Sequence, residues 1–119
     1  AMLAFYRGIG ARVVEEVPGF LHAAYIGANK LNLHLPRAWQ SARFTLRAAV
    51  ARPGCADLCL VWTGSAEALK AMLAGLNVAI IEGPVARLGG RGENGESVYV
   101  RDPDENLIEF IIYPSTDNA

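Results

Sequence analysis

The stretch that decides the fold is residues 97–110, SVYVRDPDENLIEF. It predicts two strands, Ser97 to Arg101 and Leu107 to Tyr113, because both are rich in β-branched, aliphatic and aromatic residues. The proline, asparagine and acidic residues of Asp102 to Asn106 favour a turn between them. Glu109 lies inside the second strand, where a carboxylate is costly to bury unless it is paired or bound to a metal. The alternative is an exposed glutamate on an edge strand.

Upstream of that stretch, the pattern predicts a strand, a helix and a second strand. Asp57 to Trp62 is the first strand, and Ser65 is a candidate N-cap for a helix over Ala66 to Leu76, whose apolar residues recur at helical spacing. Val78 to Glu82 is predicted as a strand, and the glycine-rich segment from Gly83 to Gly95 as a flexible loop or wide hairpin. The second half therefore has the order strand, helix, strand, strand, strand.

The first half repeats this order without its opening strand. The predicted elements are a helix that ends near Tyr6 and strands at Arg12 to Val17, Phe20 to Ile26 and Lys30 to Leu35. Along the last of these strands, leucines alternate with Asn32 and His34, so one face is apolar and the other is polar. Residues 37–54 show no sustained period and are interpreted as the connection between the halves.

Length and charge limit the classes of function. The 119 residues predict a single domain over residues 1–119. A net charge of -1, with acidic and basic residues scattered along the chain, argues against nucleic acid or a membrane surface as a partner. No apolar stretch approaches the roughly 20 residues that cross a bilayer, and no signal peptide is recognisable, which predicts a cytoplasmic protein. Cys55 and Cys59 are predicted to be reduced thiols.

Five segments resemble the vicinal oxygen chelate family, which includes glyoxalases, bleomycin resistance proteins and extradiol dioxygenases. They are FYRGIGARVV at 5–14, ANKLNLHLP at 28–36, RPGCADLCLVW at 52–62, IIEGPVARLG at 80–89 and SVYVRDPDENLIEF at 97–110. The resemblance implies an α+β fold of paired βαβββ modules around a cavity. The first module, truncated at its N-terminus, would occupy residues 2–36, a linker residues 37–54 and the second module residues 55–113.

The resemblance also implies a metal site. Members of the family commonly bind a divalent metal that chelates two neighbouring substrate oxygens. Glu109 matches the last ligand and would be the catalytic residue, with His34 and Asp57 as further ligands of zinc, nickel, manganese or iron. Asn32 is an alternative to His34, and a turn-forming role is the alternative for Asp57. The first ligand of the family has no counterpart, because the strand that carries it is absent from this chain.

Several residues are predicted to contact a substrate: Asn32, His22, Trp62 and Tyr99. For the aromatic residues the alternative is packing in the core, and for His22 it is a partly buried side chain that only forms a hydrogen bond. Arg37, Arg43 and Arg47 either clamp an anionic substrate or belong to a solvated linker.

Two functions follow from the resemblance. The first is a metal-free protein that binds a small molecule in the cavity between the modules, and the absent first ligand favours it. The alternative is a divalent-metal-dependent lyase or dioxygenase-like enzyme, and a degenerate structural module is a third reading. An unfilled strand position would leave backbone donors and acceptors exposed, which predicts a homodimer, with or without strand swapping.

Overall fold

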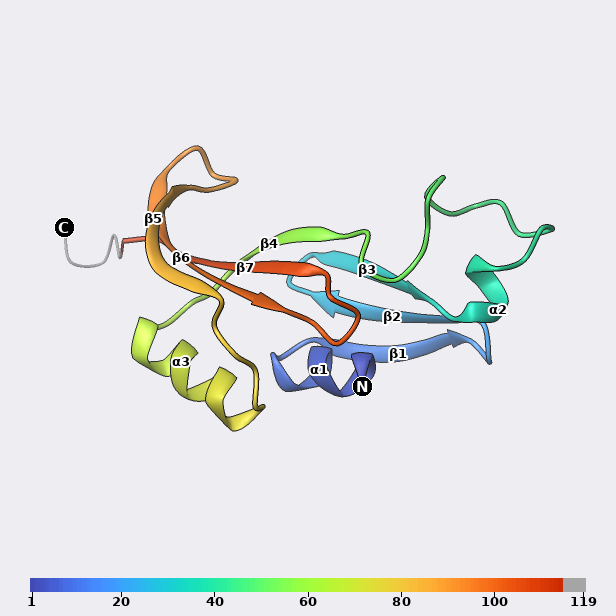
Figure 1. Ribbon diagram of the computed structural model, residues 1–119, viewed down its shortest axis with the longest axis horizontal. Coiled ribbons are helices and arrows are strands. Elements are labelled where there is room, and N and C mark those ends of the chain that lie inside the picture. Colours follow the sequence, from blue (N-terminus) through green and yellow to red (C-terminus); the bar gives the residue numbers. More distant parts are fainter. Residues whose placement is uncertain (115–119) are drawn as a thin grey trace. The chain divides into compact units, whose positions relative to one another are not determined.

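The computed structural model describes residues 1–114, which form two compact units (Figure 1). Unit 1 comprises Ala1–Cys55 and unit 2 begins at Ala56. Each unit has its own antiparallel hairpins and its own sheet. The predicted α+β class and the repeated order of elements are confirmed. None of the described helices is long and apolar enough to pass through a bilayer.

Unit 1 contains a three-stranded antiparallel sheet with β2 in the middle. Its elements are α1 (Met2–Gly8), β1 (Arg12–Val17), β2 (Leu21–Ile26), β3 (Asn29–His34) and α2 (Pro36–Trp39). Ala23 and Ala24 of β2 are both fully buried. The short helix α2 lies in the segment interpreted as a connection, and Pro36 begins it because the fixed φ of proline suits the first helical position.

Unit 2 contains a four-stranded sheet with the order β4-β7-β6-β5. Its elements are β4 (Asp57–Val61), α3 (Ala66–Gly75), β5 (Glu82–Leu88), β6 (Asn94–Arg101) and β7 (Leu107–Ile112). β4 pairs with β7 in parallel, whereas the other two pairs are antiparallel. Ser65 caps α3 as predicted, because its hydroxyl accepts the backbone N–H of Ala68 at 3.0 Å.

The prediction of a strand at Val78–Glu82 was wrong, whereas the segment that follows it forms a hairpin, one of the two alternatives predicted for it. β5 begins at Glu82 and continues to Leu88, and β6 begins at Asn94, so the two strands form a hairpin through most of the glycine-rich segment. Pro84 lacks the N–H of a ladder bond, but β5 is an edge strand and its register shifts between Glu82 and Val85. The ladder therefore accommodates a proline that the sequence pattern marked as a strand end.

The turn between β6 and β7 is held by its own side chains. The buried carboxylate of Asp102 accepts the backbone N–H groups of Asp104 and Asn106, each at 3.0 Å, and the side-chain amide of Asn106 at 2.9 Å. Asn106 in turn accepts the N–H of Ala56 at 2.9 Å and so ties the turn to the start of β4. Glu105 adopts a left-handed φ of 69°, a position that usually favours glycine.

The two faces of the unit 2 sheet differ. On one face Val98, Val100, Ile108 and Phe110 are buried, and Trp62 packs edge-on against Phe110 while its Nε1–H donates to the carbonyl of Ser65 at the start of α3. We call this the α3 face, since Leu69 and Leu73 of α3 are also fully buried (Figure 1). The opposite face holds Glu109, and we call it the Glu109 face.

Candidate functional site

A row of four side chains crosses the Glu109 face. Backbone pairing places Glu82 opposite Tyr99, Tyr99 opposite Glu109, and Glu109 opposite Cys59. Directly paired residues project from the same face of a sheet, so strands β5, β6, β7 and β4 each contribute one member of the row. The row brings together residues that lie up to fifty positions apart in the sequence.

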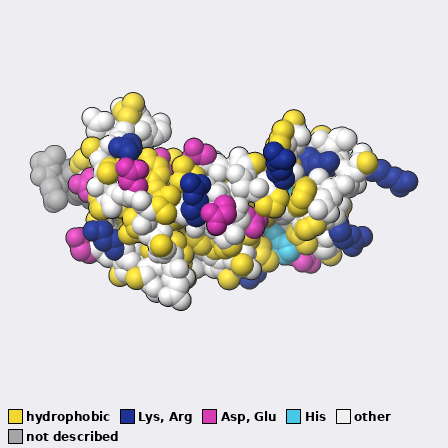
Figure 2. Space-filling model, viewed as in Figure 1, with side chains coloured by type: hydrophobic (Ala, Val, Ile, Leu, Met, Phe, Trp, Pro, Cys, Tyr) yellow, Lys and Arg dark blue, Asp and Glu magenta, His cyan; other side chains and the backbone are white. Residues whose placement is uncertain are grey.

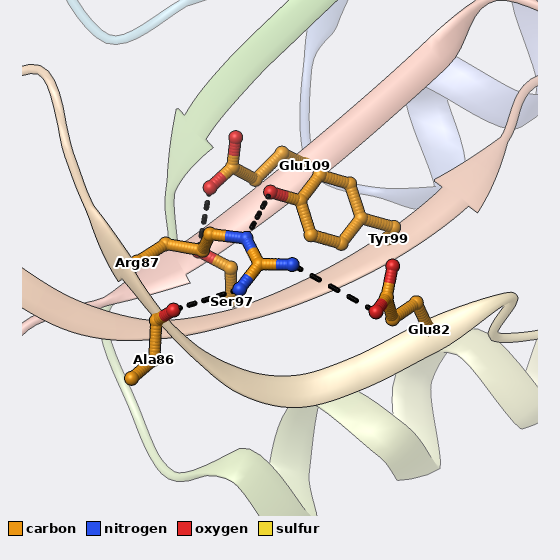
Figure 3. A network of polar contacts seen from close by, with 6 residues as sticks. All are labelled: Glu82, Ala86, Arg87, Ser97, Tyr99 and Glu109. Carbon is orange, nitrogen blue, oxygen red and sulfur yellow. Dashed lines mark hydrogen bonds and ion pairs between the residues drawn. The ribbon is translucent and has the colours of Figure 1, made fainter.

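Glu109 is the most closely held member of this row. Its side chain is half-buried, and Oε2 accepts the hydroxyl of the fully buried Ser97 at 2.6 Å (Figure 3). Partial removal from water raises the pKa of the Cys59 thiol, and the charge of Glu109 and a hydrogen bond to its side chain raise that pKa further. The protonated thiol is thus a second donor to the carboxylate. These bonds fix the position of an acidic group that faces partly into solvent.

Arg87 joins the row from β5. Its Nε–H donates to the hydroxyl of Tyr99 at 3.2 Å, one terminal nitrogen donates to the carbonyl of Ala86 at 2.9 Å, and the other lies 3.7 Å from a carboxylate oxygen of Glu82 (Figure 3). The guanidinium also lies over the Tyr99 ring, 5.7 Å from its centre. Sequence reasoning missed Arg87 because no strand was assigned to its segment, which was interpreted as a flexible loop or a wide hairpin. With β5 assigned, strand alternation would have placed it on the Glu109 face.

Apolar side chains flank the polar row. The next row across the sheet is Val85, Ser97, Ile111 and Val61, and Val61 is 47% exposed. On the other side Leu107 pairs with Asp57, so Asp57 lies two residues from Cys59 on the same face. Acidic and basic side chains are interspersed with hydrophobic ones over unit 2 in the view of Figure 2. The Glu109 face thus combines hydrogen-bonding groups with apolar surface, which is the composition of small-molecule sites.

Trp62 and His22 were also predicted to contact substrate. Trp62 belongs to the α3 face of unit 2, opposite Glu109 and Tyr99. His22 pairs with Leu33, whereas His34 pairs with Leu21, so the two histidines project from opposite faces of the unit 1 sheet. The Nε2 of His22 lies 3.3 Å from a carboxylate oxygen of Glu15 on the neighbouring strand.

His34 and Asn32 share one face of unit 1, as the alternation predicted. The His34 ring lies 5.7 Å from the ring of Phe44, which in turn packs edge-on against Phe20 at 5.1 Å. The Nδ1 of His34 is buried and has no hydrogen-bond partner among residues 1–114. Asn32 is exposed.

Arg47 holds the segment that contains Phe44 through hydrogen bonds to backbone carbonyls. One terminal nitrogen of Arg47 donates to the carbonyls of Ala38 at 3.1 Å, of Ser41 at 2.9 Å and of Phe44. The hydroxyl of Ser41 accepts the backbone N–H groups of Arg43 and Phe44. Arg47 therefore satisfies backbone acceptors of its own segment, which differs from both alternatives considered for it, a substrate clamp and a solvated linker.

The predicted metal ligands are divided between the units. Glu109 and Asp57 lie on the same face of unit 2, whereas His34 belongs to unit 1. In the part of the chain that the structure describes, no group of three or more His, Cys, Asp or Glu side chains is arranged to hold a metal ion. Two carboxylates alone are a small ligand set for a divalent transition metal, and unit 2 by itself does not fit such an ion.

A cavity of about 460 Å³ lies elsewhere in unit 2. It is open and mainly apolar, and its lining consists of Ala66, Asn94, Gly95, Glu96, Ile112, Tyr113 and Pro114. None of the residues predicted to act on a metal or substrate belongs to this lining. Its volume is within the range of small-molecule sites, but the titratable side chains of the polar row are on the Glu109 face.

Comparisons with known proteins agree with this architecture. No protein-family model matches the sequence. The chain is 37% identical over 110 residues to the virulence protein STM3117 of Salmonella typhimurium, a match that covers 86% of this chain and 73% of that protein. The crystal structure of STM3117 has a TM-score of 0.80 at 34% identity, covering 95% of this chain and 86% of that one.

Two further relatives carry glyoxalase names. The glyoxalase domain-containing protein RDO1 of Mycosarcoma maydis is 38% identical over 109 residues, and the match spans 92% of this chain but 58% of RDO1. Lactoylglutathione lyase from Agrobacterium tumefaciens has a TM-score of 0.67 at 25% identity, covering 94% of this chain and 83% of that one. The sheets and these likenesses define a glyoxalase-like protein. The chain belongs to the vicinal oxygen chelate superfamily, as the resemblance implied.

Proposed function

We propose that the protein binds a small organic molecule in the manner of glyoxalase and bleomycin resistance proteins, with the Glu109 face of unit 2 as its binding surface. One observation carries the proposal: a half-buried carboxylate bonded to Ser97 and a tyrosine hydroxyl bonded to Arg87 belong to directly paired residues of one face (Figure 3). The neighbouring row of that face contains apolar side chains. A few convergent polar groups on an otherwise apolar surface orient a ligand, while the apolar groups contribute affinity.

Of the residues expected from the sequence to contact a ligand, Tyr99 is central to this proposal. Asn32 and His34 remain candidates, since both project from one face of unit 1. His22 and Trp62 are not included, because His22 pairs with Glu15 and Trp62 packs on the α3 face.

The test is a thermal-shift screen of the purified protein against a library of neutral and charged aromatic and aliphatic small molecules. A ligand that occupies the Glu109 face should raise the Tm of the wild type and of Glu93→Ala, but not that of Glu109→Ala. Glu93 is a matched control, because it is an exposed carboxylate in the connection between β5 and β6. Hits that stabilise all three proteins equally would contradict the proposed surface.

The second candidate is a divalent-metal-dependent enzyme of the lyase type. The 25% identity to a lactoylglutathione lyase favours it, as does the buried Nδ1 of His34 without a partner among the described residues. Metal content measured by mass spectrometry, with Tm recorded after addition of zinc, nickel, manganese or iron, distinguishes the candidates. Stoichiometric metal whose stabilisation disappears in Glu109→Ala would support the enzyme, and protein without metal or shift would leave the binding function.

We further propose that the protein forms a homodimer. The outer edge of β7 is covered by β4 in parallel pairing, whereas β3, the last strand of unit 1, has no strand on its outer edge among residues 1–114. Such an edge exposes unpaired backbone donors and acceptors, and pairing with the β3 of a second copy would satisfy them across a twofold axis. Sedimentation equilibrium should give twice the chain mass of 12.8 kDa. A monomer at micromolar concentration would overturn the assignment.

A further inference from the structure

The hydroxyl of Tyr99 has a hydrogen that no described protein group accepts. The Nε–H of Arg87 can only donate, so the Tyr99 oxygen is the acceptor in their 3.2 Å hydrogen bond. The phenolic hydrogen of Tyr99 therefore points elsewhere, and among residues 1–114 it has no acceptor. Arg87 thus acts as a positioning residue, because its bond to the oxygen restricts the directions in which Tyr99 can donate.

Glu109, which is paired directly with Tyr99, has a carboxylate that can accept further hydrogen bonds. An ionised carboxylate accepts about four hydrogen bonds. At Glu109 the Oε2 takes the hydroxyl of Ser97, and the Cys59 thiol is a further donor. Figure 3 shows the second carboxylate oxygen directed away from Ser97. A free donor and a free acceptor thus lie on neighbouring strands of the same face.

The charges nearby decide the charge of the ligand. Glu82 and Glu109 flank Tyr99 on its two sides, and Arg87 is the one cation in the network of Figure 3. Two carboxylates on either side of Tyr99, with one guanidinium paired to Glu82, disfavour an additional anion, because like charges would be brought together on a partly desolvated face. The arrangement favours a neutral group.

Building on the proposed function, we infer that the ligand carries a neutral hydrogen-bond acceptor and donor side by side, as in a primary carboxamide or a lactam. The carbonyl oxygen accepts from Tyr99, and the N–H donates to Glu109. The apolar remainder of the ligand packs on the neighbouring row, where Val61 is exposed. Such a site recognises the carbonyl and the N–H of the ligand through two separate hydrogen bonds. Each hydrogen bond can therefore be removed on its own.

The experiment titrates benzamide and N,N-dimethylbenzamide into the isotopically labelled wild type and follows amide chemical shifts. Benzamide has both groups, whereas its dimethyl derivative keeps the carbonyl and lacks the N–H. We expect the wild type to bind benzamide about tenfold more tightly, the usual effect of one hydrogen bond to a charged partner. In Glu109→Ala this preference should vanish, and in Tyr99→Phe both compounds should bind more weakly.

Tyr113→Phe is the matched control, since Tyr113 is a half-buried tyrosine that lines the cavity rather than the polar row. It should bind both compounds as the wild type does. Equal affinity of the wild type for both compounds, tighter binding of benzoate than of benzamide, or no binding of either amide would overturn the inference. The proposed function is judged separately, since a library hit without an amide that requires Glu109 would uphold it.

Discussion

Each unit carries a tyrosine on the central one of three consecutive antiparallel strands, β2 in unit 1 and β6 in unit 2, but opposite charges flank the two tyrosines. We call this strand the middle strand of the unit. In unit 1, Tyr25 lies between Arg12 and Lys30 in the strand register. In unit 2, Tyr99 lies between Glu82 and Glu109. A residue from the first strand of each hairpin completes the cluster, Glu16 in unit 1 and Arg87 in unit 2. The unit 1 cluster therefore contains two cations and one carboxylate, and the unit 2 cluster contains two carboxylates and one cation.

The hydrogen bonds of the two clusters differ as well. The Tyr25 hydroxyl and the Lys30 ammonium both donate to Glu16, each at 3.0 Å, and the Arg12 guanidinium lies 4.3 Å from the centre of the Tyr25 ring. The unit 1 cluster thus uses its tyrosine hydrogen internally. The Tyr99 hydroxyl instead accepts from Arg87 and keeps its hydrogen free. The tyrosine hydrogen thus forms a bond within unit 1, whereas in unit 2 it is the donor that we propose for a ligand.

The largest effect should come from the residue next to each tyrosine on the middle strand. Val98 and Ala24 each precede the tyrosine of their strand, and both are fully buried. Val98→Ala gives unit 2 the smaller residue of unit 1, and it should lower the free energy of unfolding by about 2–3 kcal/mol through lost apolar burial and a cavity. Chemical denaturation monitored by circular dichroism measures the change.

The reverse substitution sharpens the same comparison. Ala24→Val adds two methyl groups where unit 1 is closely packed, and overpacking of this kind costs about 1–3 kcal/mol. A stability gain in Ala24→Val would show that unit 1 contains unfilled space beside Tyr25. A loss below about 0.5 kcal/mol for Val98→Ala would show that the unit 2 core relaxes to fill the gap.

The next effect concerns the two tyrosines themselves. Tyr99→Phe should weaken benzamide binding about tenfold, because the free donor is lost, while Tyr25→Phe should leave the affinity unchanged. Stability should respond in the opposite order. Tyr25→Phe breaks a hydrogen bond to the Glu16 carboxylate and should lower the Tm more than Tyr99→Phe does. Equal effects of both variants on binding would show that the two clusters do not differ in function.

Much of the fold could be predicted from the sequence because patterns within short segments agreed with the order of elements along the chain. The strand pair at 97–110, the Ser65 cap and the alternation along β3 each use neighbouring residues, and each is confirmed. β5 was misplaced because glycine and proline usually end strands, whereas this edge strand accommodates them. The hydrogen bonds of Arg47 within residues 38–47 are made to backbone carbonyls, and no sequence pattern predicts them.

The candidate site was predictable in part for the same reason. Glu109 and Tyr99 stand out as polar groups in strands, and both were named from the sequence. Ser97, Cys59 and Arg87 contact them only through sheet pairing, which depends on the strand register and on the order β4-β7-β6-β5. A parallel pair such as β4 with β7 joins segments separated by the whole module, so the partnership of Cys59 with Glu109 has no local signal.

A smaller effect should be seen in the reactivity of the Cys59 thiol. Unit 1 has no counterpart of this residue, since no strand lies beyond β3 among the described residues. Burial first, and then the charge of Glu109, raise the pKa of this thiol. Glu109→Gln removes the charge but not the burial, so the pKa should fall part of the way and alkylation by iodoacetamide at pH 8 should quicken several-fold. The rate is measured in a Cys55→Ser background with Glu93→Gln as control. An unchanged pH–rate profile would show that Glu109 does not influence the thiol.

The smallest effect should be the titration of the unit 1 cluster. The hydrogen bond from Lys30 first, and that from Tyr25 second, lower the pKa of Glu16 below its ordinary value of 4.5. A carboxylate with a lowered pKa stabilises the folded state above its unfolded pKa, and this contribution is lost as the pH falls through the folded value.

Lys30→Met should therefore raise the Glu16 titration midpoint toward 4.5, as followed by carbon NMR of the carboxylate, with only a slight loss of stability because the pair is exposed. Lys70→Met on α3 removes an equal charge far from Glu16 in the sequence and outside its hydrogen bonds, so it should leave the midpoint in place. A midpoint unchanged in Lys30→Met would mean that Tyr25 holds Glu16 alone. The tyrosines of both units would then be able to bond a nearby carboxylate without help from a cation. The difference between the two clusters would lie in Arg87, whose Nε–H donates to the Tyr99 hydroxyl.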